Sequence, residues 1–207
     1  MKKAKKILAL LLCAVLLIGA TVAGTLAYLT AQTSVTNTFT VGSVSFVKDN
    51  ELDETIVNEY GDAVTGTGAG RTTEGNEYKL IPGHTYTKDP TIHISAGSED
   101  CYLFVKVENG ISAIEDSSST ILAQMTSNGW SALEVNGTTV SNVYCKANPV
   151  VTATNANNDV TIFESFTIAT NADVSSYGDA KIVITAYAVQ ADGFDSAAEA
   201  WTKANFS

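Results

Sequence analysis

Short runs of alternating apolar and polar residues, separated by turn residues, fill most of the chain after residue 30. Alternation with a period of two is typical of a half-buried β-strand. In the first such run Val35, Phe39 and Val41 share one face, and the apolar positions change face beyond Gly42. A change of face at a glycine predicts a bulge or kink that redirects the strand.

The segment 90–95 shows the alternation clearly. The period of two predicts that Ile92 and Ile94 point inward and that Thr91 and His93 point outward. This segment is therefore expected to form a strand with one core face and one solvated face.

Other runs predict further strands, which differ in how many of their faces are covered. Residues 102–107 are apolar at nearly every position, which is typical of a strand covered on both faces. Asn136-Gly137 lies between two alternating runs, 130–135 and 138–146, and is the strongest short signal for a β-hairpin. Further strand-like runs are 77–81, 160–168 and 181–190.

Two segments show a helical pattern instead. Residues 119–125 place apolar side chains on one helical face, after a serine or threonine that can cap the start. Near the C terminus, a serine followed three residues later by glutamate forms a capping box before a short helix. The residues that carry these signals are Ile121, Leu122 and Met125 in the first segment, and Ser196 and Glu199 in the second.

Together these elements predict an all-β fold, a jelly-roll-like antiparallel β-sandwich with one or two short helices. Residues 28–207 suit a single domain. Within it, 28–47 is interpreted as a mobile N-terminal strand. Residues 50–77, acidic and then rich in Gly and Thr, are interpreted as a long surface loop.

The segment 1–27 has the three parts of a secretory signal peptide: a basic start, an apolar middle and small residues at the end. Thr25 and Ala27 occupy the positions that a signal peptidase requires, so the mature chain is expected to begin at Tyr28. The alternative is an uncleaved membrane anchor, because residues 7–29 form an uncharged run close to the ~20 residues that cross a bilayer. The chain is therefore expected to be secreted or on the cell surface, with the membrane contacted only through this segment.

Loss of residues 1–27 leaves eight basic and 22 acidic residues, a formal net charge of −14. A domain of that charge repels phosphate backbones, which excludes a nucleic-acid partner. Two cysteines remain, Cys101 and Cys145. In an exported chain they are compatible with a disulfide bond or with two buried free thiols.

No recognisable catalytic pattern, cofactor motif or metal site is present in the sequence. The two histidines, His84 and His93, belong to no zinc-binding arrangement and are interpreted as structural. The acidic cluster Asp49, Glu51, Asp53 and Glu54 lacks the spacing and the glycine of a calcium loop, so we expect it to be a solvated face. No catalytic residue, cofactor or metal ligand is therefore expected, and the chain is not expected to be an enzyme.

The N-terminal region resembles the TasA and camelysin family of secreted Gram-positive proteins. The resemblance rests on residues 24–30 (GTLAYLT) followed by 37–42 (NTFTVG), and more loosely on LIPG at 80–83, KDP at 88–90 and AYAVQA at 186–191. It implies export through a dedicated signal peptidase of the SipW type. Family members are often cut one residue later than Ala27.

For TasA-like members the resemblance also implies a biofilm-matrix fibre, in which the N-terminal segment freed by cleavage acts as a donor strand in the next subunit. Such head-to-tail contacts, if they do not close into a ring, generate a filament. The donor residues implied here are Val35, Asn37, Phe39, Val41 and Gly42. Camelysin-like members imply a metalloprotease instead, and a monomeric adhesin or ligand-binding β-sandwich is the third alternative.

Overall fold

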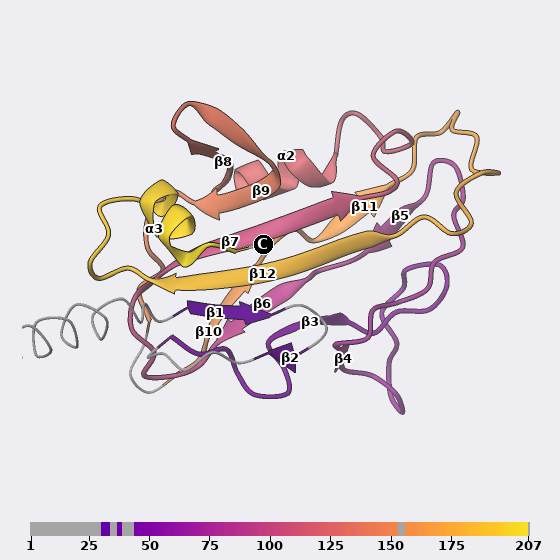
Figure 1. Ribbon diagram of the computed structural model, residues 1–207. Coiled ribbons are helices and arrows are strands. Elements are labelled where there is room, and N and C mark those ends of the chain that lie inside the picture. Colours follow the sequence, from indigo (N-terminus) through magenta and orange to yellow (C-terminus); the bar gives the residue numbers. More distant parts are fainter. Residues whose placement is uncertain (1–29, 34–36, 39–43, 153–155, 207) are drawn as a thin grey trace, which may run out of the picture.

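Two layers of antiparallel β-sheet form the body of the protein in the computed structural model (Figure 1). The structure describes residues 30–33, 37–38, 44–152 and 156–206. The predicted antiparallel β-sandwich with two short helices is confirmed. The predicted signal peptide lies outside the described residues.

The first layer is a six-stranded sheet with the order β2-β1-β12-β7-β9-β8. Every neighbouring pair in it is antiparallel. The central pair, β7 and β12, is in register over nine residues from Cys101↔Gln190 to Asn109↔Ile182. The strands of this sheet are β1 (Thr30–Thr33), β2 (Asn37–Thr38), β7 (Cys101–Asn109), β8 (Trp130–Val135), β9 (Thr138–Lys146) and β12 (Ile182–Gln190).

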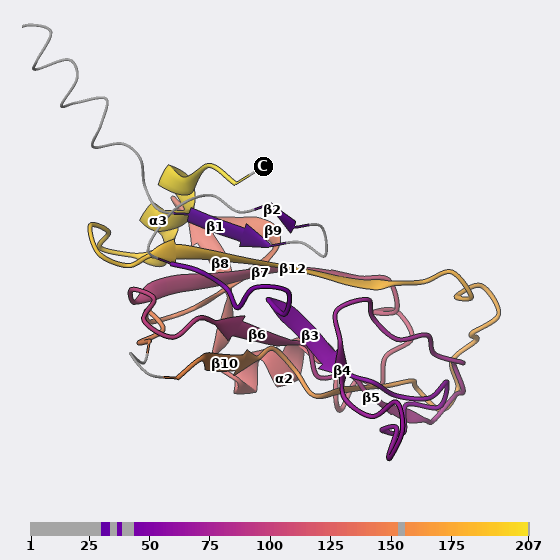
Figure 2. The ribbon, with the colours of Figure 1, turned by 90° about the horizontal axis from the view of Figure 1, so that it is seen from below.

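The second layer holds a four-stranded sheet, β10-β6-β3-β4, and a two-stranded sheet, β11-β5. Figure 2 shows β6, β10 and β3 lying below β7 and β12. The strands of the second layer are β3 (Leu52–Thr55), β4 (Arg71–Thr72), β5 (Thr85–Thr87), β6 (Thr91–Ile94), β10 (Asn158–Thr161) and β11 (Ser165–Thr167).

The six-stranded sheet buries side chains on both of its faces. Leu103 and Val105 of β7 belong to the inner core between the layers, together with Ile92 and Ile94 of β6. Phe104, the residue between them, points to the other face and joins an outer core. The near-continuous apolar run in β7 was predicted to be covered on both faces, and this prediction is confirmed.

The outer core is closed by helix α3 (Ala197–Ala204), which lies against the outer face of the six-stranded sheet (Figure 1). Its Trp201 packs on Phe104 and Tyr187 with ring centroids 5.1 and 5.4 Å apart. The side chain of Ser196 caps the first turn by accepting a hydrogen bond from the Glu199 N–H at 3.2 Å. The capping signal therefore correctly predicted where this helix begins.

Helix α2 (Ile121–Ser127) supplies Ile121 and Met125 to the inner core. Thr120 caps it, because its hydroxyl accepts from the Ala123 N–H at 3.1 Å. Leu122 was expected on the same face but is 49 % exposed, so the buried stripe is narrower than predicted. The helix is tied to β11 by a 2.8 Å hydrogen bond from the Gln124 side chain to a backbone carbonyl.

The hairpin between β8 and β9 turns at Asn136 and Gly137, as predicted. Both residues have positive φ, 52° and 75°. A two-residue hairpin loop with positive φ at both positions is the type favoured by the twist of the strands, and Asn-Gly tolerates that backbone best.

Candidate functional site

The first described strand, β1, lies second from the edge of the six-stranded sheet, between β2 and β12. Strand β1 pairs antiparallel with β12, from Thr30↔Val189 to Thr33↔Ala186. On its other side it pairs with β2 over two residues. Figure 1 shows β1 running beside one half of β12. The other half of β12, Ile182 to Thr185, lies beyond the described part of β1.

A cavity of about 880 Å³ adjoins this other half of β12. It opens between β12 in the first layer and β3 in the second, and the segments 72–80 and 177–181 line its sides. Apolar side chains such as Ile111, Phe166 and Ile184 form much of the wall, whereas Glu54 and Lys88 supply charge. The sandwich is therefore hollowed between β12 and β3.

The charged wall of the cavity follows from the register of β3. Leu52 pairs with Ile92, whose side chain lies in the inner core. Because side chains alternate along a strand, Glu54 points to the same inner side as Leu52. Glu54 is only 4 % exposed. A carboxylate buried in this way must be paired to be tolerated.

Two groups pair with the Glu54 carboxylate, one on each oxygen. Oε2 accepts a hydrogen bond from Nζ of Lys88, which is itself buried and follows β5 directly. Oε1 accepts from the backbone N–H and from the side-chain Nδ2 of Asn76, at 2.9 and 2.8 Å. The carboxylate thus joins an amine and a carboxamide from two different segments.

The Asn76 carboxamide is held at both of its ends. Its Nδ2 also donates to the carbonyl of Thr55 at 2.9 Å, and its Oδ1 accepts from the N–H of Val57 at 3.0 Å. Gly75, just before it, has a φ of 82°, a backbone that other residues rarely adopt. The orientation of the amide group is therefore fixed by strand β3 and the residues that follow it.

An aromatic cluster shields this group from one side. Tyr78 lies edge-on to Tyr86 and Phe166, at centroid distances of 5.6 and 5.1 Å. Burial, together with the charge of Glu54, raises the pKa of the Tyr78 hydroxyl. Tyr78 is consequently a neutral donor here, and its hydroxyl donates to the carbonyl of Thr87 at 3.0 Å.

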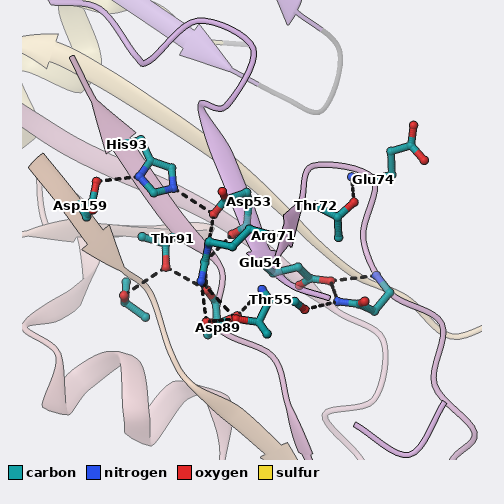
Figure 3. Close-up of polar contacts among 12 residues, drawn as sticks. Asp53, Glu54, Thr55, Arg71, Thr72, Glu74, Asp89, Thr91, His93 and Asp159 are labelled. Atoms are coloured by element: carbon teal, nitrogen blue, oxygen red, sulfur yellow. Dashed lines mark hydrogen bonds and ion pairs between the residues drawn. The ribbon is translucent and has the colours of Figure 1, made fainter. Parts of the chain in front are cut away.

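On the opposite face of the second sheet, a second set of charges surrounds Asp53 (Figure 3). Nε of Arg71 lies 2.5 Å from Oδ1 of Asp53, and Nη1 lies 2.8 Å from Oδ2 of Asp89. Nε2 and Nδ1 of His93 face Asp53 and Asp159 at 2.9 and 2.6 Å. The set thus combines three carboxylates with one guanidinium and one imidazole.

The protonation of this set follows from its contacts. Burial acts to raise the pKa of Asp53, but hydrogen bonds from His93 and Arg71 outweigh it and hold the pKa below its usual value. Burial acts to lower the pKa of His93, but hydrogen bonds to Asp53 and Asp159 outweigh it and raise the pKa above 6.5. Both ring nitrogens can donate at once only in the charged imidazolium, so these contacts favour the protonated form.

The structure corrects the prediction of a solvated acidic face for three residues of the cluster, whereas Asp49 is exposed as predicted. Glu51, Asp53 and Glu54 are buried, at 6, 3 and 4 % exposure, and β3 and β4 occupy part of the predicted loop 50–77. The outward side chains predicted for β6 are also covered: Thr91 is buried and His93 lies under its two carboxylates. The physical reason for Asp53 and Glu54 is that cations distant in the sequence pair with them: Arg71 and His93 with Asp53, and Lys88 with Glu54.

No family model, curated protein or solved structure matches the chain. In the part of the chain that the structure describes, no group of three or more His, Cys, Asp or Glu side chains could hold a metal ion. Among the same residues, no helix has the length and apolar character needed to cross a membrane.

Most residues of the predicted export and donor segments lie outside the described residues. These are Thr25, Ala27, Tyr28, Val35, Phe39, Val41 and Gly42. Asn37 is described, and it lies in β2 opposite Thr33. Of the described residues in this region, those of β1 therefore lie beside β12, and those of β2 lie on the far side of β1.

Cys101 and Cys145 are both buried and free, so the disulfide alternative is not realised. Cys101 belongs to the inner core and Cys145 to the outer core, on opposite faces of the six-stranded sheet. Burial raises the pKa of the Cys101 thiol to about 12 and also raises that of Cys145. Two thiols on opposite faces of one sheet cannot bond without unfolding it.

Sequence reasoning missed the Glu54, Lys88 and Asn76 group and the part played by Arg71. The sequence held one signal for the role of Arg71, because it is the only arginine in the chain. It sits at the end of a Gly- and Thr-rich tract, where a solvated loop would not require it. Nothing in the sequence indicated the role of Asn76, because an asparagine beside a glycine is typical of an ordinary turn.

Proposed function

We propose that this protein is a secreted structural protein, a biofilm-matrix fibre subunit that assembles by N-terminal donor-strand exchange. One observation carries the proposal: the N-terminal strand β1 pairs with β12 along the side of β12 that faces away from β7. The segment next to the predicted export signal thus supplies the last two strands, β1 and β2, at one side of the main sheet. The resemblance of residues 24–30 and 37–42 to the TasA and camelysin family supports the same reading.

The physical need for an edge partner is clear from β12. Its nine residues are largely apolar, and most of them are buried. Their sequence is IVITAYAVQ. An exposed apolar edge strand is a template for pairing with another chain. A strand from outside supplies main-chain hydrogen bonds, and its alternate side chains fill the pockets along the edge. In the fibre, the N-terminal segment of one copy lies against β12 of the next.

The register of β1 defines where a longer donor would run. A strand continued beyond Thr33 in the same register meets Thr185 and then Ile184, Val183 and Ile182. Position 35 of the donor would oppose Ile184, which belongs to the inner core and lines the cavity. Val35 is one of the donor residues implied by the family resemblance, so register and resemblance select the same position.

A truncation tests the assembly. Protein beginning at Tyr28 is expected to form filaments in a concentration-dependent manner, as seen by electron microscopy, and protein beginning at Gly42 is expected to stay monomeric. Equal behaviour of the two proteins would contradict the proposal.

A peptide tests the acceptor edge directly. The peptide 28–42 added to the protein that begins at Gly42 is expected to bind and to raise its melting temperature, because ligands of the native state stabilise it. The matched control is the same peptide with Val35→Lys and Phe39→Lys, which should not bind. Binding of the control with equal affinity would remove the side-chain part of the proposal.

The cavity favours a second candidate function, that of a monomeric ligand-binding β-sandwich or adhesin. Concave sites with apolar walls and a few polar groups are the usual form of small-ligand sites. This function predicts a monomer at all concentrations that binds a glycan or matrix protein. Removal of residues 66–70, which leaves Arg71 in place, should weaken that binding if the loop takes part in it.

A further inference from the structure

Three side chains that can react with one another meet in the wall of the cavity. Lys88 offers a primary amine, Asn76 a carboxamide and Glu54 a carboxylate that contacts both. They come from the end of β5, from the segment after β4 and from β3. We propose that Lys88 and Asn76 become joined by an intramolecular isopeptide bond, and that Glu54 is the catalytic residue of this reaction.

The environment suits the reaction because charged groups are poorly solvated there. The side chains of Lys88 and Glu54 are 10 and 5 % exposed. Tyr78 and Phe166 line the same cavity and limit the access of water. Transfer of a proton from an amine to a carboxylate leaves two neutral groups, which need less solvation than the two ions. A neutral amine is the nucleophile that the reaction needs.

The carboxamide is oriented for attack. Its oxygen, Oδ1, accepts the Val57 N–H at 3.0 Å, so a backbone donor is already aimed at the atom on which negative charge develops. Its nitrogen, Nδ2, faces Oε1 of Glu54 at 2.8 Å. The group that must leave is thus beside the group that can protonate it, and the attacking amine is bound to the other oxygen of the same carboxylate.

The steps balance without any oxidant or co-reactant. Glu54 takes one proton from the Lys88 ammonium, and the neutral Nζ adds to Cγ of Asn76, which places negative charge on Oδ1. Glu54 gives its proton to Nδ2 and takes a second proton from Nζ. The Cγ–Nδ2 bond breaks as the carbonyl re-forms, and ammonia departs with the proton held by Glu54 as ammonium. The product is an amide between Lys88 and Asn76.

A covalent bond at this place would fasten the segment after β4 to the end of β5, across the cavity wall. It does not depend on the proposed strand exchange, since all three side chains belong to one copy of the chain. A monomer and a fibre subunit would carry the same bond.

Intact mass spectrometry tests the bond. With the N terminus established by sequencing, the purified protein is expected to be lighter than its sequence by one ammonia. In a tryptic digest, blocked cleavage after Lys88 should leave peptide 80–106 attached to peptide 72–79. A mass equal to that of the sequence, with free peptides 80–88 and 89–106, would overturn the proposal.

Two variants separate this bond from other losses of ammonia. Asn-Gly pairs, such as Asn136-Gly137, can lose ammonia by cyclising to a succinimide, and Lys88→Arg leaves these pairs unchanged. Lys88→Arg and Glu54→Gln are both expected to show the full sequence mass. Loss of ammonia that persists in Lys88→Arg would overturn the proposal. If Glu54→Gln does not fold, the linked peptides of the unaltered protein still decide the matter.

Discussion

Nε2 of His93 lies 2.9 Å from Oδ1 of Asp53, although 40 positions separate the two residues in the chain. The other ring nitrogen faces Asp159 at 2.6 Å. Since His93, Asp53 and Asp159 lie on β6, β3 and β10, one imidazole links three neighbouring strands of the second sheet. The stability of that sheet should therefore depend on the charge of a single side chain.

This dependence has a definite sign. The pKa of His93 is raised in the folded protein, because its hydrogen bonds to Asp53 and Asp159 outweigh the opposing effect of burial. The contribution is fully present below the unfolded pKa of 6.5 and is lost as the pH rises through the folded pKa. We expect the free energy of unfolding, from urea titrations, to be lower at about pH 9 than at about pH 6.

The matched variant is His93→Gln, which keeps a polar side chain of similar length and has no titration in this range. Its free energy of unfolding should change less between the two pH values. An equal change in both proteins would show that other groups govern the pH dependence.

Arg71 is the second cation beside Asp53, and its loss should be costly. Arg71→Ala leaves the buried Asp53 carboxylate with one partner fewer and is expected to destabilise the protein by about 3 kcal/mol, as for other broken buried pairs. Arg71→Lys should recover part of this, since an ammonium cannot reproduce the contacts to both Asp53 and Asp89. Urea denaturation measures both effects.

The control for Arg71 is an exposed ion pair of the same chain. Lys48 and Asp49 lie 3.9 Å apart with side chains 83 and 77 % exposed. Lys48→Ala should change the free energy of unfolding by less than about 1 kcal/mol, because solvent screens such pairs. Similar losses for Arg71→Ala and Lys48→Ala would contradict the role assigned to Arg71.

Local signals predicted the elements of this fold well and the charged groups poorly. Asn136-Gly137 determines its turn by its own backbone preference, and Ser196 caps a helix that begins at the next residue, so neighbours in sequence suffice. Asp53 is different, because its partners Arg71 and His93 lie 18 and 40 positions away. A single sequence cannot show that pairing. When the pairing is not known, a run of acidic residues predicts a solvated face.

The half of β12 that lies beyond the described part of β1 offers a test of assembly in the intact chain. Val183 lies on this half and is 41 % exposed. Val183→Lys should suppress filament formation, because a charge on a strand edge disfavours pairing with another chain. The fold should be retained, with a change of less than about 1 kcal/mol in the free energy of unfolding.

Leu122→Lys is the matched control for this variant, since Leu122 is another exposed apolar residue, at 49 %, but lies on α2. It should leave filaments intact. If both variants abolish filaments, general surface hydrophobicity and not the β12 edge would drive assembly.

The two buried thiols should not react with alkylating reagents in the native protein. Burial raises the pKa of Cys101 to about 12 and raises that of Cys145, and a thiol reacts as its thiolate. Iodoacetamide at neutral pH should label neither in the folded protein that lacks residues 1–27, and should label both in urea without any reductant. Failure to label the unfolded protein until a reductant is added would reveal a disulfide.

The place of β12 in the six-stranded sheet has a consequence for how the chain acquires its structure. This strand, near the C-terminal end of the sequence, lies between β1 and β7 and joins the two halves of the sheet. Until residues 182–190 have been synthesised, β1 and β7 have no common neighbour and the sheet cannot close. A growing chain therefore makes its most distant contacts last, so the sheet can form only late in synthesis, and pairings between segments so far apart in sequence are slow to form.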